Sequence, residues 1–379
     1  MGILLRFYFI TPLPFNYKFL LHAHSHTALL GWVYLGLTTL IYRIFLQDAQ
    51  KPKLYKRIFI FTNICILGML ITFPFQGYAL FSITFSTLFL FASYWFSWFA
   101  IKHVPSHFKN RFSWKLIKNS LWYLVISSIG PWAIGIVMAT LGPESIWYKT
   151  SIYIYLHFQY NGWFILALLG VLFYILEEKQ IHFNPQKLKS FNILLNTGVI
   201  FTVFLSVLWF KPPIIFYVLG LIGALAQMLA FYEVYSMVNP HFRALQKSIT
   251  AHGNLLLKIA GGLLVLKLFM QVFSAFPYIA NLAFILKDFV IGYLHLVFLG
   301  IVITTMLSFL QYFKLLKLPK IFIGLFLFAF VTTEILIFYK ASAIWLGLPI
   351  FKEYFLLLAI LSCLFPIAVG ILFLKNIKS

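Results

Sequence analysis

Long runs of apolar residues, separated by short polar joints, follow one another along almost the whole sequence. Each run is long enough, at about 1.5 Å per helical residue, to cross roughly 30 Å of hydrocarbon. The runs do not alternate apolar and polar residues as barrel strands would, and a backbone in lipid must satisfy its own polar groups. We therefore predict an all-α, polytopic transmembrane bundle of about eleven spans, at residues 19–45, 57–74, 76–102, 114–141, 147–176, 190–210, 212–238, 252–275, 284–313, 319–340 and 350–375.

Residues 1–18 precede the first predicted span and differ from it in length and pattern. Met1–Ile10 is apolar but too short to cross a bilayer, has no small-residue cleavage site, and runs into Thr11-Pro12-Leu13-Pro14. This segment predicts a short non-spanning stub and not a cleavable signal peptide. Because no hydrophilic segment interrupts the apolar series that follows, we expect residues 1–379 to form a single integral membrane domain.

Composition agrees with this class of protein. Hydrophobic residues make up 62% of the chain and charged residues 10%, whereas a soluble domain carries roughly 25% charged residues. The net charge of +21 would suit a nucleic-acid partner, but the Lys and Arg side chains lie in short loops between apolar runs, where they orient helices and meet anionic lipid. We therefore expect a lipid bilayer as partner and no nucleic acid.

Loop charge alternates along the chain, and this alternation predicts the orientation. Every second loop is basic, beginning with the loop after the first span, which holds Arg43, Lys51, Lys53, Lys56 and Arg57. The intervening joints carry few charges, and one missed helix would break the pattern. The positive-inside rule then places the C-terminus in the cytoplasm. We expect the protein to reside in a bacterial inner (cytoplasmic) membrane.

Five of the ten histidines lie well within spans, whereas His252 lies at the very start of one, and these five are the main polar chemistry available. His22, His24 and His26 lie in the first span, His157 in the fifth and His295 in the ninth. The predicted orientation puts all three segments in the outer half of the bilayer. Polar groups at such depth are usually functional or paired, and imidazole is the commonest metal ligand. The alternative is that they only form hydrogen bonds between helices.

Glycines flank these histidines, at Gly31, Gly162, Gly292 and Gly300. Glycine lets a bulky flat ligand approach the backbone closely. The alternative is ordinary close packing of helices through small residues.

The histidines, with the segments His24-Ser-His26-x-x-Leu-Leu-Gly-Trp32, Tyr155-Leu-His157 and Tyr293-Leu-His295, resemble the catalytic subunit of heme-copper oxidases and its heme-binding relatives, including the membrane proteins of the nitric-oxide response. That family has twelve helices, with histidines on the second, sixth, seventh and tenth. If this chain lacks the family's first helix, its first, fifth and ninth spans correspond to the second, sixth and tenth.

The resemblance implies one low-spin heme b, held by one of His22, His24 or His26 together with His295. His157 falls on the helix that carries the single copper histidine in the family. It would then be a remnant, a hydrogen-bond donor to a metal ligand, or part of an altered metal site. The pattern also departs from the family. The span matching the seventh helix has no histidine, and Tyr293 stands where the high-spin heme ligand would be.

Because of these departures, we expect neither a bound copper ion nor the reduction of oxygen to water. The resemblance still allows an oxidoreductase function, in which a bis-histidine heme passes electrons from an electron-donor protein or a quinol, or responds to nitric oxide.

Two other function classes remain open from the residues. A membrane oxygenase could hold non-heme iron through these histidines, although such sites usually use more histidines or a carboxylate. A transporter or permease would suit eleven spans, with Lys267 and Glu334 lining a path, although no inverted repeat is evident.

Overall fold

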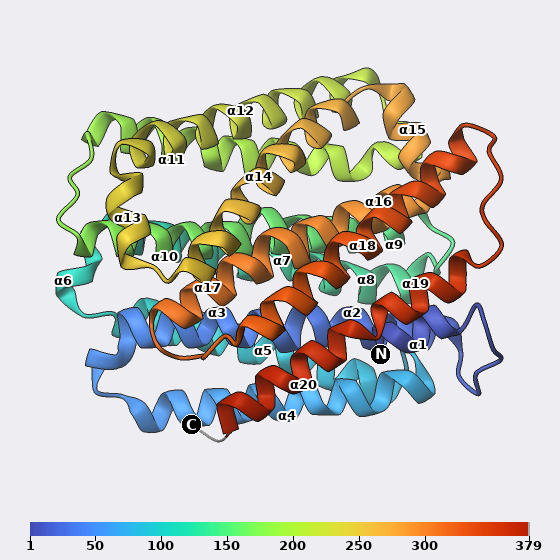
Figure 1. Cartoon of the computed structure of the whole chain (residues 1–379), viewed down its shortest axis with the longest axis horizontal. Helices are drawn as coiled ribbons and strands as arrows, with labels where there is room; N and C mark the ends of the chain where they lie inside the picture. The colour runs from blue at the N-terminus through green and yellow to red at the C-terminus, as the bar shows by residue number, and fades with distance from the viewer. Residues whose placement is uncertain (378–379) are drawn as a thin grey trace. The chain divides into compact units, whose positions relative to one another are not determined.

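The computed structural model describes residues 1–377, whose regular secondary structure is entirely helical, with no β-strand among them (Figure 1). The chain divides into two compact units, each described by itself. Unit 1 comprises Met1–Pro105 together with Met306–Ser379, and unit 2 comprises Ser106–Thr305. The ninth span passes from one unit to the other. The expectation of a single membrane domain stays a prediction.

The prediction of eleven membrane spans is confirmed, since the structure has eleven helical segments long and apolar enough to cross a bilayer. Most ends fall within about five residues of the predicted ones. The seventh span is the exception, because a turn and the short helix α13 prolong it. The spans are Tyr17–Ala49, Pro52–Gln76, Leu80–His103, Phe112–Thr140, Ile146–Glu178, Pro185–Phe210, Ile214–Ser248, Ala251–Ser274, Lys287–Tyr312, Lys320–Trp345 and Tyr354–Ile377.

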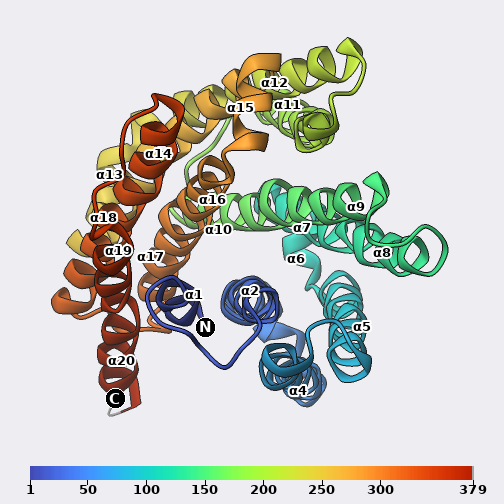
Figure 2. The ribbon, with the colours of Figure 1, turned by 90° about the vertical axis from the view of Figure 1, so that its right-hand side faces the viewer.

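Unit 1 is built around the first span, with α4 and α5 packed side by side and α2 against α4 (Figure 2). The side chain of Asn16 starts α2 by accepting a hydrogen bond from the backbone N–H of Lys18. The stub forms the short helix α1, which packs on α19 and α2. The helices are α1 (Gly2–Phe7), α2 (Tyr17–His26), α3 (Tyr34–Ile41), α4 (Pro52–Gln76), α5 (Leu80–His103), α17 (Thr304–Tyr312), α18 (Lys320–Trp345), α19 (Tyr354–Ser362) and α20 (Leu364–Ile377).

Unit 2 contains two closely packed helix pairs, α11 with α12 and α7 with α10. At the start of α7 the carboxylate of Glu177 accepts hydrogen bonds from Ser113, 2.9 Å from its backbone N and 2.6 Å from its Oγ. The helices are α6 (Ser106–Lys109), α7 (Phe112–Ser127), α8 (Ile129–Thr140), α9 (Ile146–His157), α10 (Ile165–Glu178), α11 (Pro185–Phe201), α12 (Ile214–Val238), α13 (Phe242–Ser248), α14 (Ala251–Ser274), α15 (Pro277–Ile285) and α16 (Lys287–His295).

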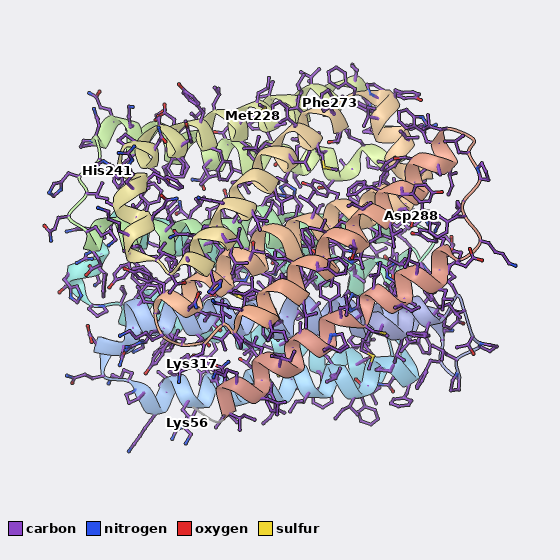
Figure 3. The ribbon with its side chains drawn as sticks, viewed as in Figure 1. Lys56, Met228, His241, Phe273, Asp288 and Lys317 are labelled. Atoms are coloured by element: carbon purple, nitrogen blue, oxygen red, sulfur yellow. The ribbon has the colours of Figure 1, made fainter. Side chains whose placement is uncertain are left out.

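In a bundle of consecutive spans, successive loops lie at alternate ends of the helices. Within unit 2, His241 and Asp288 lie at opposite ends of the spans (Figure 3). Within unit 1, Lys56 and Lys317, from two basic loops, lie toward the same end (Figure 3). Which end faces the cytoplasm stays a prediction from loop charge.

Candidate functional site

His26, His157 and His295 occupy the same local position, the last residue of an α-helix directly before a π-helical segment. The π-helical segments are Thr27–Val33, Phe158–Phe164 and Leu296–Ile303. Only one further π-helical segment, Tyr42–Leu46, occurs among the described residues. Because π-helical turns are rare and often mark functional sites, their coincidence with three membrane histidines sets these positions apart.

A glycine follows each of these histidines by five residues, inside the π-helical segment: Gly31, Gly162 and Gly300. In two cases a tryptophan comes next, Trp32 and Trp163. This recurrence does not stand out as an internal repeat in the sequence, because one histidine and one glycine are too sparse a pattern among apolar residues. The recurring helix-to-π junction is what makes it visible.

Gly31 and Gly162 are also close-packing positions. A Cβ at Gly162 would lie 2.6 Å from Cβ of Tyr123 on α7, and one at Gly31 would lie 3.3 Å from Cγ2 of Ile66 on α4. At these two positions the structure therefore fits the packing alternative, in which glycine admits a neighbouring helix.

The three histidine-bearing spans are the most buried of the eleven. In their most apolar windows 67%, 78% and 61% of residues are buried, compared with at most 50% in any other span. These spans are therefore the most interior ones. Of their histidines, His157 is buried, whereas His26 and His295 are half-buried.

His26 has one ring nitrogen engaged by backbone and one facing a tyrosine. Its Nδ1 lies 2.9 Å from the carbonyl oxygen of His22. Because a carbonyl only accepts, Nδ1 carries the proton and Nε2 keeps its lone pair. Nε2 faces the Tyr78 hydroxyl at 3.4 Å, a long contact, and the ring lies 4.5 Å from that of Phe73. A histidine that binds a metal typically donates its second ring N–H in this way.

The other two histidines of the first span have different surroundings. The His22 ring packs edge-on against Tyr78 at 4.6 Å between centroids. The His24 ring lies against α1, where a Cβ on Gly2 would come within 3.0 Å of its Cε1. His22 and His26 share one helix face, as a spacing of four residues predicts, whereas His24 points elsewhere. The structure therefore distinguishes three histidines among which the sequence chose no ligand, and His26 has the best placed ring nitrogen.

His157 is buried in unit 2 with both ring nitrogens engaged. Nε2 lies 2.8 Å from the carbonyl oxygen of Val199, so it carries the proton. Nδ1 then accepts, at 3.3 Å from Ser206 Oγ and 3.4 Å from Asn161 Nδ2. This arrangement matches the hydrogen-bonding alternative, because the lone pair of His157 Nδ1 faces two donors inside unit 2, whereas that of His26 Nε2 faces only one.

His295 ends α16 in unit 2 and is half-buried. The π-helical segment after it packs near the one after His157, with 6.3 Å between the ring centroids of Phe164 and Phe298. Tyr160 also contacts Phe298, at 6.2 Å. Unit 2 thus brings the fifth and ninth spans together at their π-helical segments.

Lys267 is the polar residue whose surroundings the sequence least anticipated. It is 1% exposed, and its Nζ donates to Asn161 Oδ1 at 2.7 Å and Gln227 Oε1 at 3.0 Å. Its ammonium group therefore does not extend to the membrane surface as a snorkelling lysine would. The sequence feature that would have predicted these contacts is the presence of Asn161 and Gln227 inside apolar spans, because carboxamides there also need hydrogen-bond partners.

No group of three or more His, Cys, Asp or Glu side chains within residues 1–377 could hold a metal ion. The two cysteines in that range, Cys65 and Cys363, are free thiols. Within the described residues the membrane histidines therefore do not form a site with three protein ligands, and His26 is the best arranged of them.

Comparison of the chain with protein-family models and with curated proteins finds no match. The resemblance to heme-copper oxidases therefore rests on the histidines, their order along the chain and the helix count. What the structure itself establishes is a polytopic helical membrane protein with histidines at three helix-to-π junctions.

Proposed function

We propose that this protein is an integral membrane heme-binding protein in which His26 would bind the iron of heme b. One observation carries the proposal: His26 donates Nδ1–H to the carbonyl of His22 and so directs a lone pair from Nε2. The long contact with the Tyr78 hydroxyl occupies that lone pair. On binding iron, His26 Nε2 would give up this weak hydrogen bond with Tyr78 and form a bond to the metal instead.

A porphyrin suits this ligand set better than a bare metal ion does. Porphyrin supplies four nitrogen ligands of its own, so the protein needs to add only one or two axial groups. A non-heme iron site usually requires two histidines and a carboxylate. Phe73 and Tyr78 beside His26 add aromatic surfaces of the kind that accompany a flat apolar group.

His295, in unit 2, is the next candidate for a heme ligand. It shares with His26 the last position of an α-helix before a π-helical segment and the glycine five residues later. The family resemblance also pairs a histidine of the first span with His295. Copper is not part of the proposal, because His157 is held by Val199, Ser206 and Asn161.

A bound heme would supply one-electron redox chemistry or an iron that responds to nitric oxide. The protein's own contribution would be to hold the His26 ring in one tautomer. An electron-donor protein or a quinol would be the partner, in a bacterial cytoplasmic membrane with the C-terminus inside.

The test is absorption spectroscopy of protein purified in detergent from a heme-replete host. We expect a sharp α-band on reduction with dithionite, lost in His26→Ala and in His295→Ala. His24→Ala is the matched control, since that ring faces α1, and it should keep the band. Well-folded protein without heme, or equal losses in all three variants, would contradict the proposal.

A further inference from the structure

Lys267 lies well inside a membrane span, on α14, which runs from Ala251 to Ser274. It is seven residues from the nearer end of the helix, about 10 Å at 1.5 Å per residue. A charged group at this depth is costly, and such residues usually pair with another group or mark a binding site. The groups that surround the amine therefore decide its role.

Two chains of hydrogen bonds, here called arms, lead to Lys267. In the first arm, only one assignment of donors and acceptors is possible. Val199 offers a carbonyl, so His157 must donate from Nε2 and accept at Nδ1. Asn161 must then present its NH2 to His157 and its Oδ1 to Lys267. The carboxamide orientation is thereby fixed by the backbone at the far end.

In the second arm, which contains Thr202 and Gln227, the donors and acceptors are fixed in the same way. The Thr202 hydroxyl donates to the carbonyl of Gly198 at 2.7 Å, and therefore accepts from Gln227 Nε2 at 3.1 Å. Gln227 is left with its Oε1 toward Lys267. Both arms end at neighbouring carbonyls of α11, where that helix gives way to the 3-10 turns of Thr202–Phe210. Two fixed oxygens thus face the amine, which favours its charged form.

The ammonium group is hydrogen-bonded but its charge is not neutralised. No carboxylate among residues 1–377 forms an ion pair with Lys267. An ammonium has three donors, and Asn161 and Gln227 take two of them. One N–H of the amino group remains without a partner among the described residues, in a buried environment.

A second buried group lies one turn further along the same helix face. Gln271 is 5% exposed, and its Oε1 has no hydrogen-bond partner among the described residues. Residues four apart on a helix are neighbours. Because a carboxamide can rotate to present either its oxygen or its NH2, Gln271 can place a donor beside Lys267.

We propose that Lys267 and Gln271 form a binding site for one small monovalent anion in the interior of unit 2. The ammonium supplies the charge and its third N–H, and the Gln271 carboxamide supplies a further N–H. Asn161 and Gln227 hold Nζ in place from the opposite side. Inorganic anions and small carboxylates share this chemistry. The proposal is independent of heme, since it uses none of the residues assigned to the iron.

The experiment measures the thermal unfolding midpoint (Tm) of the full-length protein in neutral detergent at constant ionic strength. Chloride, bromide, nitrate or formate replaces gluconate, which is too large for a buried site. We expect a saturable rise in Tm with at least one of the small anions. Preference for formate over the halides would identify a carboxylate ligand, and the reverse an inorganic anion.

Three variants assign the effect to these residues. Lys267→Met should abolish the anion dependence, and Gln271→Met should weaken the apparent affinity at least threefold. Lys258→Met removes a lysine nearer the start of the same helix and should behave as the unaltered protein. If Lys267→Met does not fold, the Gln271 variant still decides.

Two results would overturn the proposal. One is a Tm that does not respond to any of the four anions. The other is an anion response that persists in Gln271→Met with unaltered affinity, or in Lys267→Met, which would place the binding elsewhere and leave Lys267 as a structural link between helices.

Discussion

His26 Nδ1 lies 2.9 Å from the backbone carbonyl oxygen of His22, one helical turn earlier. The contact selects one tautomer, orients the ring, and turns Nε2 toward Tyr78. It also gives His22 a role that needs no imidazole, because the group it contributes to His26 is a carbonyl. A substitution at His22 should therefore affect heme less than one at His26.

The Tyr78 hydroxyl competes for the nitrogen that we assign to iron. Tyr78→Phe removes this 3.4 Å contact and keeps the aromatic ring. Since a neutral hydrogen bond contributes roughly 0.5–1.5 kcal/mol, we expect heme affinity to be unchanged or up to about tenfold higher. Titration of heme-free protein with heme would measure it. A large loss of affinity in Tyr78→Phe would show that the hydroxyl supports the ligand instead.

His157 is expected to matter for stability more than for heme. His157→Ala removes the hydrogen bonds that the ring makes with the Val199 carbonyl and the Asn161 NH2, and it opens a cavity. We expect a loss of about 2–4 kcal/mol in the free energy of unfolding, measured by denaturation in detergent. The heme spectrum of the folded fraction should be retained. His182→Ala, in an exposed loop, should change neither quantity, and loss of heme in His157→Ala alone would return His157 to the ligands.

Gly162 allows α7 to approach the fifth span. Gly162→Ala would place a Cβ 2.6 Å from Tyr123 Cβ, so one of the two helices must shift. We expect a destabilisation of about 1–3 kcal/mol. In Gly135→Ala, where the added Cβ meets nothing within 4 Å, the higher helix propensity of alanine should give a neutral or slightly positive change. Equal unfolding midpoints for the two variants would count against close packing at Gly162.

Glu177 and Glu178 are adjacent but should differ in importance. Glu177 accepts two hydrogen bonds from Ser113 at the start of α7, whereas Glu178 pairs with Arg111 at the surface. We expect Glu177→Ala to cost about 1–2 kcal/mol, as the loss of a helix cap does, and Glu178→Ala to cost less than about 1 kcal/mol, as exposed ion pairs do. Chemical denaturation of both variants in the same detergent tests the order, and a reversed order would show that the ion pair is the stronger contact.

The sequence by itself determined the class of fold and the series of spans. Apolar runs such as 57–74 and 319–340 are helices because a backbone in lipid has no other way to satisfy its polar groups. The number of spans follows from the number of such runs, and helix geometry likewise determines that His22 and His26 share a face while His24 does not.

Only the tertiary structure decided which polar groups meet. His157 and Lys267 are 110 residues apart in the chain, yet Asn161 contacts both. No periodicity encodes such a contact, because it depends on which helices pack and on where each one departs from α geometry. The π-helical segments after His26, His157 and His295 could not be predicted for the same reason. Hydropathy does not report a local change of helical pitch, which depends on the packing of neighbouring helices.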